Sequence, residues 1–209
     1  MAAMPARDCN GGNVAIAGLI LAGGAGRRMG GADKALLPLA GQPLVAHLAA
    51  ALGPQVSVLA ISANGDAGRF ADLGLPVLAD APGAQGQGPL AGVLAGLDWA
   101  AGQGAAALVT ASVDTPFLPR DLVVRLRDAA QGGMALAVSG GRLHPTAALW
   151  PVAGRDRLRD LFDTGERRMR LALQGAAEAA FDAAPDPFFN INTLEDLARA
   201  ETLFAGRAS

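Results

Sequence analysis

The chain has 209 residues, of which 51% are hydrophobic and 17% charged, and its formal net charge is −2. This composition excludes an intrinsically disordered protein, because it holds enough apolar residues for a substantial core. The near-neutral charge gives no basis for a nucleic-acid partner, and no apolar run reaches the roughly 20 residues that a membrane span requires.

Residues 1–12 are expected to form a flexible tail. Residues 1–13 lack the apolar segment of a secretory signal, and the single Cys9 has no second cysteine for an internal disulfide, which is typical of a reducing compartment. We therefore expect a cytoplasmic protein that binds neither nucleic acid nor membrane.

Apolar runs alternate with helical spacings along the first 130 residues. The run Val14–Leu21 predicts a strand buried on both faces, and Leu44, Leu48 and Leu52 predict a helix that opens at Pro43. Further strands are expected at 56–62, 75–79 and 105–113, and further helices at 67–73, 90–101 and 120–130. This alternation is typical of an α/β fold with a mostly parallel sheet covered by helices on both faces.

The remaining residues continue without a linker. Strands are expected at 134–139, 143–150 and 178–181, and helices at 151–162 and 166–173. The sequence Thr193-Leu194-Glu195-Asp196 has the form of a capping box, and the helix after it is expected to place Leu194, Leu197, Ala198 and Phe204 on one face. We find no internal repeat, so we expect a single domain over 13–209.

A glycine-rich loop follows the first strand. Between Gly23 and Lys34 lie five glycines, two arginines and one lysine. Glycines let backbone N–H groups face a ligand closely, and such groups form an anion-binding concavity. The loop lacks a Walker motif, and Met29 stands where a dinucleotide fingerprint needs its third glycine, which counts against an NAD-dependent oxidoreductase. The loop is either a cradle for the phosphates of a nucleotide or an ordinary glycine-rich turn.

Polar residues directly follow three further strands of the predicted sheet. They are Asn64, Asp80 and Asp114, and ligands of parallel sheets bind at the carboxyl ends of the strands. Asp114 can ligate Mg²⁺ or cap the following turn, and Asp80 has the same two interpretations. Asn64 can bind a base or ribose, or simply form a turn with Gly65.

The last third of the chain holds three further candidates. His144 can contact an anionic substrate or pack beside Leu143, and Arg167 with Arg168 can form a second anion site or a surface helix start. Asn190 and Asn192 alternate with Ile191 and can point the same way or organise the turn before the helix. Two histidines and one cysteine match no common zinc spacing. No serine, cysteine or lysine stands in a nucleophile-like context, which favours phosphoryl or nucleotidyl transfer.

These motifs together resemble a known family. The loop from Leu21 to Lys34 resembles the signature loop of nucleotidyltransferases that join NTPs to phosphorylated acceptors. Within that group the chain resembles the molybdenum cofactor guanylyltransferases, with matching motifs in order over residues 18–200. The motifs are Val77-Leu78-Ala79-Asp80, Gly88-Pro89-Leu90-Ala91-Gly92, Asp114-Thr115-Pro116-Phe117, His144-Pro145-Thr146, Gly165-Glu166-Arg167-Arg168 and Asn190-Ile191-Asn192-Thr193.

The resemblance implies a three-layer Rossmann-like nucleotidyltransferase fold and transfer of GMP from GTP to the terminal phosphate of Mo-molybdopterin, with release of pyrophosphate. It implies a nucleotide-binding half over 13–130 and an acceptor-binding half over 131–209. The GTP contacts it implies are Leu21, Ala22, Gly23, Gly24, Lys34, Asn64, Asp80, Gly88, Pro89, Leu90 and Asp114. It assigns catalysis to Arg28, Lys34 and Asp114, Mg²⁺ to Asp114, and the acceptor to His144, Arg167, Arg168, Asn190 and Asn192.

Other functions stay open at this point. A molybdopterin cytidylyltransferase and a sugar-1-phosphate nucleotidyltransferase would use related motifs, and a GTP-binding regulator would bind the nucleotide without transfer. We expect a monomer that receives its acceptor from a molybdenum-insertion enzyme or a molybdoenzyme chaperone.

Overall fold

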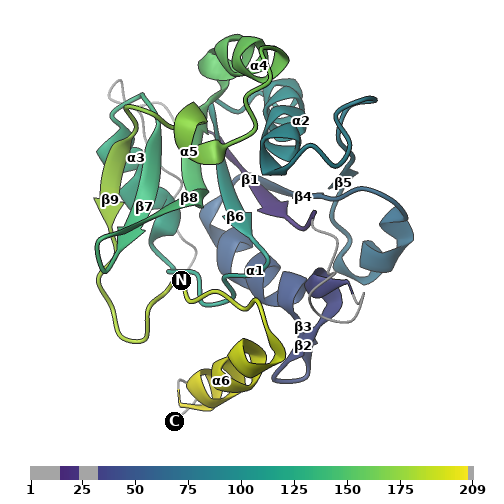
Figure 1. Cartoon of the computed structure of the whole chain (residues 1–209), viewed down its shortest axis with the longest axis vertical. Coiled ribbons are helices and arrows are strands. Elements are labelled where there is room, and N and C mark those ends of the chain that lie inside the picture. Colours follow the sequence, from purple (N-terminus) through teal and green to yellow (C-terminus); the bar gives the residue numbers. More distant parts are fainter. Residues whose placement is uncertain (1–14, 24–32, 207–209) are drawn as a thin grey trace.

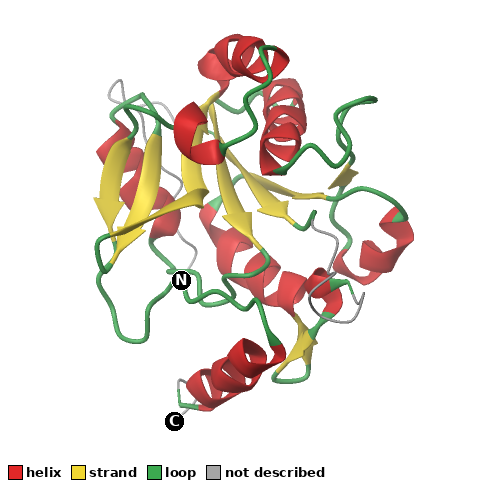
Figure 2. Ribbon diagram, in the orientation of Figure 1, coloured by secondary structure: helices red, strands yellow, loops and turns green. Residues whose placement is uncertain are grey.

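The computed structural model describes residues 15–23 and 33–206. The expected tail 1–12 and Gly24 to Ala32 of the glycine loop lie outside these residues. Figures 1 and 2 show a twisted central sheet between helices. In the part of the chain described, no helix is long and apolar enough to cross a membrane.

The central sheet has seven strands in the order β5-β4-β1-β6-β8-β7-β9. Only β8 runs antiparallel to its neighbours in this sheet, and the other neighbouring strands pair in parallel. The predicted fold class, a mostly parallel sheet in an α/β protein, is therefore confirmed. The strands are β1 (Ile16–Leu21), β4 (Val58–Ser62), β5 (Val77–Leu78), β6 (Ala107–Ser112), β7 (Ala135–Ser139), β8 (Arg142–Pro151) and β9 (Ala177–Ala180).

The central strand β1 explains why its sequence is apolar throughout. Leu19 and Leu21 point into one core cluster, and Ile16 and Ile20 point into the cluster on the opposite face. Successive side chains of a strand alternate between faces, so a strand covered on both sides needs apolar residues at every position.

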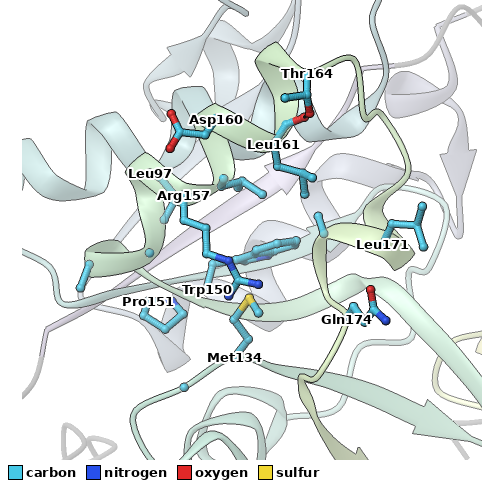
Figure 3. A pocket seen from close by; sticks show the side chains of 15 residues that line it. Leu97, Met134, Trp150, Pro151, Arg157, Asp160, Leu161, Thr164, Leu171 and Gln174 are labelled. Carbon is cyan, nitrogen blue, oxygen red and sulfur yellow. Dashed lines mark hydrogen bonds between the residues drawn. The ribbon is translucent and has the colours of Figure 1, made fainter.

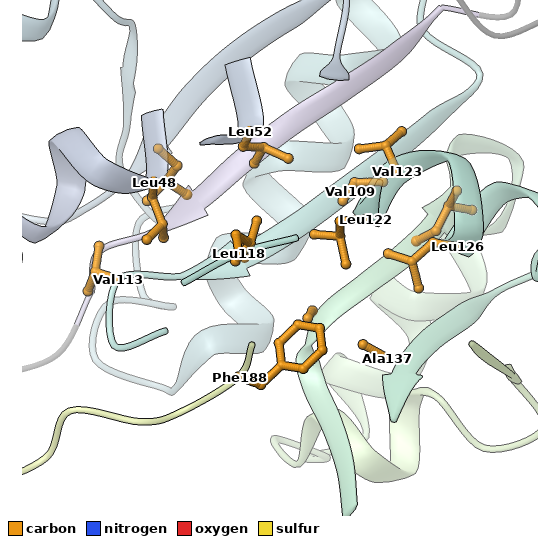
Figure 4. Packing of buried hydrophobic residues seen from close by; sticks show 14 of the residues in the cluster. Leu48, Leu52, Val109, Val113, Leu118, Leu122, Val123, Leu126, Ala137 and Phe188 are labelled. Carbon is orange, nitrogen blue, oxygen red and sulfur yellow. The ribbon is translucent and has the colours of Figure 1, made fainter. Parts of the chain in front are cut away.

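Helices cover both faces of the sheet. Helices α2 (Pro89–Gly102), α4 (Arg155–Asp163) and α5 (Met169–Ala172) pack on one face, and α1 (Leu44–Leu52) and α3 (Leu122–Ala130) pack on the other. Figure 4 shows the second face, where Leu48 and Leu52 from α1, Leu122 of α3 and the ring of Phe188 belong to one core cluster. The sheet is therefore the middle layer of three.

Two predicted helices are shorter than their hydrophobic spacing suggests. The segment 151–162 divides into a 3-10 turn, η5 (Val152–Gly154), and α4. The segment 166–173 becomes helical only in α5 from Met169, because the Glu166 carboxylate accepts the backbone N–H groups of Arg167 and Arg168 and holds an extended turn. The predicted helix 67–73 is a 3-10 helix, η4 (Ala67–Leu73).

Helix α6 (Leu194–Ala205) packs against the small hairpin of β2 (Pro38–Leu39) and β3 (Gln42–Pro43). Its capping box is present as predicted. The face that carries the four predicted residues is buried only in part, because Leu194 is 69% exposed and Ala198 is exposed. Contact is made further along the helix, where Ala200 is buried and Leu197, Leu203 and Phe204 pack around it against Leu39 and Leu44.

Candidate active site

Four neighbouring strands, β5, β4, β1 and β6, end at one edge of the sheet, and the residues that follow them are joined by hydrogen bonds. The N–H of Ala22 donates to the Ser62 carbonyl at 2.9 Å, and the N–H of Ala63 donates to the Leu78 carbonyl at 2.9 Å. The N–H of Val113 donates to the Leu21 carbonyl at 3.2 Å. The residues after β1, β4, β5 and β6 therefore lie side by side, as the sequence predicted.

Asn64 and Asp80 form a closed pair at this edge. The Asn64 amide nitrogen donates to Asp80 Oδ2 at 2.7 Å, and the Asp80 N–H donates to Asn64 Oδ1 at 3.0 Å. Asn64 therefore orients the Asp80 carboxylate, which is buried. Gly65 has φ +84° and completes a turn after Asn64. Such a turn was the predicted alternative to nucleotide binding by Asn64.

A second polar cluster surrounds Asp114 at the end of β6. Lys34 Nζ lies 3.6 Å from Asp114 Oδ2 and donates to Asn192 Oδ1 at 3.0 Å. The Asn190 amide, with its NH₂ group toward Asp114, lies 3.1 Å from both carboxylate oxygens. The N–H of Ile191 donates to the Asp114 carbonyl at 2.9 Å. We name Lys34, Asp114, Asn190 and Asn192 the Asp114 cluster.

Capping interactions stabilise the turns next to Lys34 and Asn192 in the Asp114 cluster. Lys34 begins the 3-10 turn η2 (Lys34–Leu36), and the Asp33 side chain caps this turn through the N–H of Ala35 at 3.0 Å. The Asp196 carboxylate accepts the N–H groups of Asn192 and Thr193 at 2.9 Å each. The hydrogen bond from Asn192, with those from Thr193 and the nearby charge of Lys34, lowers the pKa of Asp196. The segments that carry Lys34 and Asn192 are thus each fixed by a cap next to the cluster.

Other predicted GTP contacts have only backbone atoms to offer. Leu21, Ala22 and Leu90 are buried, whereas Gly23 is exposed at the end of β1. Gly88 has φ +92° and leads into Pro89, the first residue of α2, and the Gly88 carbonyl accepts the N–H of Ala91 in the first turn of α2 at 3.3 Å. Gly24 and Arg28 lie outside the described residues, and their roles stay predictions.

The Asp114 carboxylate fits a magnesium ligand. Among the described residues no group of three or more histidine, cysteine or acidic side chains can hold a metal alone. Mg²⁺ commonly takes one or two carboxylates and obtains its other oxygen ligands from phosphates and water. Asp114 is 24% exposed at its side chain, so its oxygens can share such an ion with a bound triphosphate.

Three residues expected at the acceptor, His144, Arg167 and Arg168, also contact other side chains of the protein. The imidazole of His144 is buried and lies 2.8 Å from Ser139 Oγ through Nε2. Burial lowers the pKa of His144, an effect that the Asp186 carboxylate opposes. Arg168 forms an ion pair with Glu166 at 2.9 Å. Contact of His144, Arg167 and Arg168 with the acceptor stays a prediction.

Arg167 links two loops that are far apart in sequence. Its guanidinium stacks on the Phe162 ring at 3.7 Å and donates to the Phe162 carbonyl. Its Nε donates to the side-chain oxygen of Gln87 at 2.7 Å. Gln87 lies in the loop between Asp80 and α2, so Arg167 stabilises the loop that precedes the predicted GTP contacts of Gly88 and Pro89.

Sequence reasoning missed several of these partners. Gln87, Ser139 and Asp186 stand in no motif, and each meets its partner only through the folded sheet. By contrast, the alternation of Asn190, Ile191 and Asn192 did indicate a shared direction for the two amides, and Ile191 is fully buried between them.

A pocket of about 740 Å³ lies at the opposite end of the sheet. Figure 3 shows the Trp150 ring between Arg157, which reaches toward it from above in this view, and Met134 below, with Leu171 at one side. Pro151 in its wall pairs with Ala107, the first residue of β6, whereas Asp114 follows the last residue of β6. The pocket is therefore separate from the Asp114 cluster.

Comparisons with known proteins bear on this geometry. The model of the MobA-like NTP transferase domain matches residues 18–180. The chain is 61% identical to a molybdenum cofactor guanylyltransferase of Rhodobacter capsulatus over 186 residues, which cover 89% of this chain and 95% of that protein. It is 51% identical to a molybdenum cofactor guanylyltransferase of Mesorhizobium japonicum over 206 residues, which cover 93% and 98%.

Solved structures share the fold at lower identity. Molybdopterin-guanine dinucleotide biosynthesis protein A of Archaeoglobus fulgidus aligns with TM-score 0.70 and 23% identity, over 91% of this chain and 99% of that chain. A 2-C-methyl-D-erythritol 4-phosphate cytidylyltransferase of Thermus thermophilus aligns with TM-score 0.66 and 22% identity, over 90% and 98%. Enzymes with different bases and acceptors therefore share this architecture.

Proposed function

The chain belongs to the molybdenum cofactor guanylyltransferases, within the family of MobA-like NTP transferase domains, and we propose how its residues carry out the transfer. It is a nucleotidyltransferase of molybdenum cofactor biosynthesis. In our proposal GTP supplies GMP, the terminal phosphate of Mo-molybdopterin receives it, and pyrophosphate is released.

The observation that carries this proposal is the Asp114 cluster. One carboxylate, one ammonium group and two amides from three separate segments meet at the carboxyl edge of the sheet. Lys34 lies 3.6 Å from Asp114 and 3.0 Å from Asn192, and the Asn190 amide lies 3.1 Å from Asp114. A triphosphate requires both a cation for its negative charge and a carboxylate for its metal ion. Lys34 and Asp114 provide these two groups beside the glycine loop.

The substrates supply the reacting atoms. An oxygen of the acceptor phosphate forms the new bond to the α-phosphorus of GTP, and the bond from this phosphorus to the oxygen bridging to the β-phosphate breaks. That oxygen leaves with pyrophosphate. A phosphate monoester is already ionised near neutral pH, since its second pKa is about 6, so the protein need not provide a base. Its work is to position the substrates and to balance charge.

The residues of the Asp114 cluster have distinct roles in this proposal. Lys34 balances the negative charge that gathers on the phosphates, and Asn190 orients the Asp114 carboxylate. Asp114 would hold Mg²⁺, which when bound would reduce the negative charge at the α-phosphate and promote departure of pyrophosphate. Arg28 would add a second cation from the glycine loop.

The test is pyrophosphate release with each NTP in turn, in the presence of Mg²⁺ and molybdenum-loaded molybdopterin. We expect release with GTP. The Asp114→Ala variant should lose about 10²–10³-fold in turnover, as expected when a group that stabilises transition-state charge is removed. Asp163→Ala is the matched control, because Asp163 is an exposed carboxylate at the end of α4. Transfer with CTP alone, or full activity of Asp114→Ala, would contradict the proposal.

The proposal includes the setting of the reaction. GTP is a cytoplasmic nucleotide, so we place the enzyme in the cytoplasm, acting as a monomer. A molybdenum-insertion enzyme or a molybdoenzyme chaperone would deliver the acceptor or receive the product. Size-exclusion chromatography with light scattering tests the monomer, and co-purification with the delivering enzyme tests the delivery.

A further inference from the structure

The segment from Asp182 to Asn192 brings the two amides to the Asp114 cluster. It leaves β9 and crosses to the start of α6 with no helix or strand of its own. Asn190 and Asn192 are both exposed, so packing of their own side chains does not place them. Other residues of the segment must hold it against the sheet.

A hydrogen-bonded triad anchors this segment. Ser139 Oγ donates to Asp186 Oδ1 at 2.7 Å and lies 2.8 Å from His144 Nε2. A serine hydroxyl has one proton, so Ser139 accepts from the Nε2–H of His144 when it donates to Asp186. Asp186 Oδ1 also accepts the N–H of Phe188 at 2.9 Å. Ser139 and His144 come from β7 and β8, so Asp186 connects the segment directly to the sheet.

An aromatic contact strengthens the anchor. Phe188 is fully buried, and its ring stacks on His144 with the ring centres 4.6 Å apart. Its edge contact with Phe181 has centres 5.5 Å apart. Figure 4 shows the Phe188 ring pointing into the core near Ala137 of β7. Phe188 precedes Asn190 by two residues, so little chain is left free between the anchor and the Asp114 cluster.

The same three residues do not form a hydrolytic site. In a catalytic triad the histidine lies between the acid and the serine, whereas here both His144 and Asp186 contact the hydroxyl of Ser139. Ser139 is 3% exposed, so a substrate cannot reach it. The arrangement satisfies buried polar groups and fixes their relative positions.

We propose that Ser139, His144 and Asp186 are positioning residues for nucleotidyl transfer, which hold the segment Asp182–Asn192 so that Asn190 and Asn192 meet Asp114 and Lys34. This inference rests on the proposed function of the Asp114 cluster. It assigns His144 a place behind the active site, where it acts through Ser139 and Phe188.

Amide hydrogen exchange tests the inference without any substrate. The N–H of Ile191 reports docking of the segment, because it donates to the Asp114 carbonyl. In Asp186→Ala and Ser139→Ala this amide should exchange at least about tenfold faster, since one buried hydrogen bond contributes roughly that factor. Amides of β1 should be unchanged. Asp182→Asn is the matched control, because Asp182 is exposed in the same segment and accepts a long hydrogen bond of 3.4 Å from the N–H of Gly140.

Turnover then shows whether the anchor acts through Asn190. We expect Asp186→Ala to slow GMP transfer about tenfold with a smaller change in the KM for GTP, and Asp186→Asn, which keeps an acceptor oxygen, to recover most of the rate. In an Asn190→Ala background, Asp186→Ala should change the rate less than about twofold, because both changes remove the same contact.

Multiplicative effects of the two changes on the rate, or an unaltered exchange rate at Ile191 in folded Asp186→Ala and Ser139→Ala, would overturn the inference. Failure of the proposed function would appear differently, as full activity of Asp114→Ala or absence of GMP transfer in the wild type. Both of these outcomes are independent of the exchange rate at Ile191, which is measured without substrate.

Discussion

Gly92 allows α2 to lie close to the strand ends that form the active-site edge. A methyl group at this position would stand 2.3 Å from Ser62 Oγ, 3.3 Å from Ser62 Cβ and 3.5 Å from Leu21 Cδ2. Gly92→Ala would gain about 0.8–1.0 kcal/mol from helix propensity. Overpacking costs about 1–3 kcal/mol, and the first distance is about 1 Å or more below ordinary contact, so the cost should lie in the upper part of that range. We expect the free energy of unfolding to fall by about 1–2 kcal/mol.

Urea unfolding followed by circular dichroism measures this change. In a Ser62→Ala background, Gly92→Ala should lower the free energy of unfolding much less. The closest remaining atoms to the added methyl group are then Ser62 Cβ at 3.3 Å and Leu21 Cδ2 at 3.5 Å. Gly102→Ala is the control in the same helix, since nothing lies within 4 Å of its added methyl group, and it should be neutral or stabilising by up to about 1 kcal/mol. A Gly92→Ala protein as stable as the wild type, or no recovery with Ser62→Ala, would refute the reasoning.

Three further predictions concern residues around the site. Burial lowers the pKa of His144 below its ordinary 6.5, so the unfolded chain binds a proton before the folded protein does as pH falls. The free energy of unfolding should therefore be constant with respect to this group well above pH 6.5 and decline below it. Urea unfolding at several pH values should show a shallower decline for His144→Gln. Hydrogen bonds from Arg168 lower the pKa of Glu166 to about 2; an NMR titration should find it there in the wild type, and Arg168→Gln should return it toward 4.5, whereas an unmoved value would contradict the pairing. Arg167→Lys should speed amide exchange in the Gln87 loop about tenfold, because lysine lacks the planar fork and the stacking surface of arginine, and equal exchange rates would contradict the link.

The sequence was most informative where local pattern decides structure. The uninterrupted apolar run of β1 predicted a strand covered on both faces. A strand with one face in solvent would instead alternate apolar and polar residues. Gly140 and Gly141, at φ +52° and +72°, form the tight turn between β7 and β8 that their sequence indicated. The capping box at Thr193 likewise fixed the start of α6, because it depends only on residues three apart.

The same patterns could not predict contacts between distant segments. Asp186 is 47 residues from Ser139, and Arg167 is 80 residues from Gln87. The residues next to each of these side chains in the sequence are equally consistent with a side chain that lies in solvent. The exposed Leu194 shows a second limit of sequence pattern. Helical spacing indicates which residues share a face of α6, but it does not indicate how much of that face the small hairpin of β2 and β3 covers.

The position of Asn190 and Asn192 has a consequence for how the two substrates are arranged. The resemblance divided the chain into a nucleotide half, 13–130, and an acceptor half, 131–209, and a division of substrates along that line stays a prediction. Yet Asn190 and Asn192 contact Asp114 and Lys34 directly. An in-line transfer needs the acceptor phosphate in contact with the α-phosphate of GTP at the moment of reaction, so the groups that bind the two substrates must also meet. If Asn190 and Asn192 bind the acceptor, their contact with Asp114 and Lys34 is what the chemistry requires, and the Asp114 cluster is where the two halves act as one site.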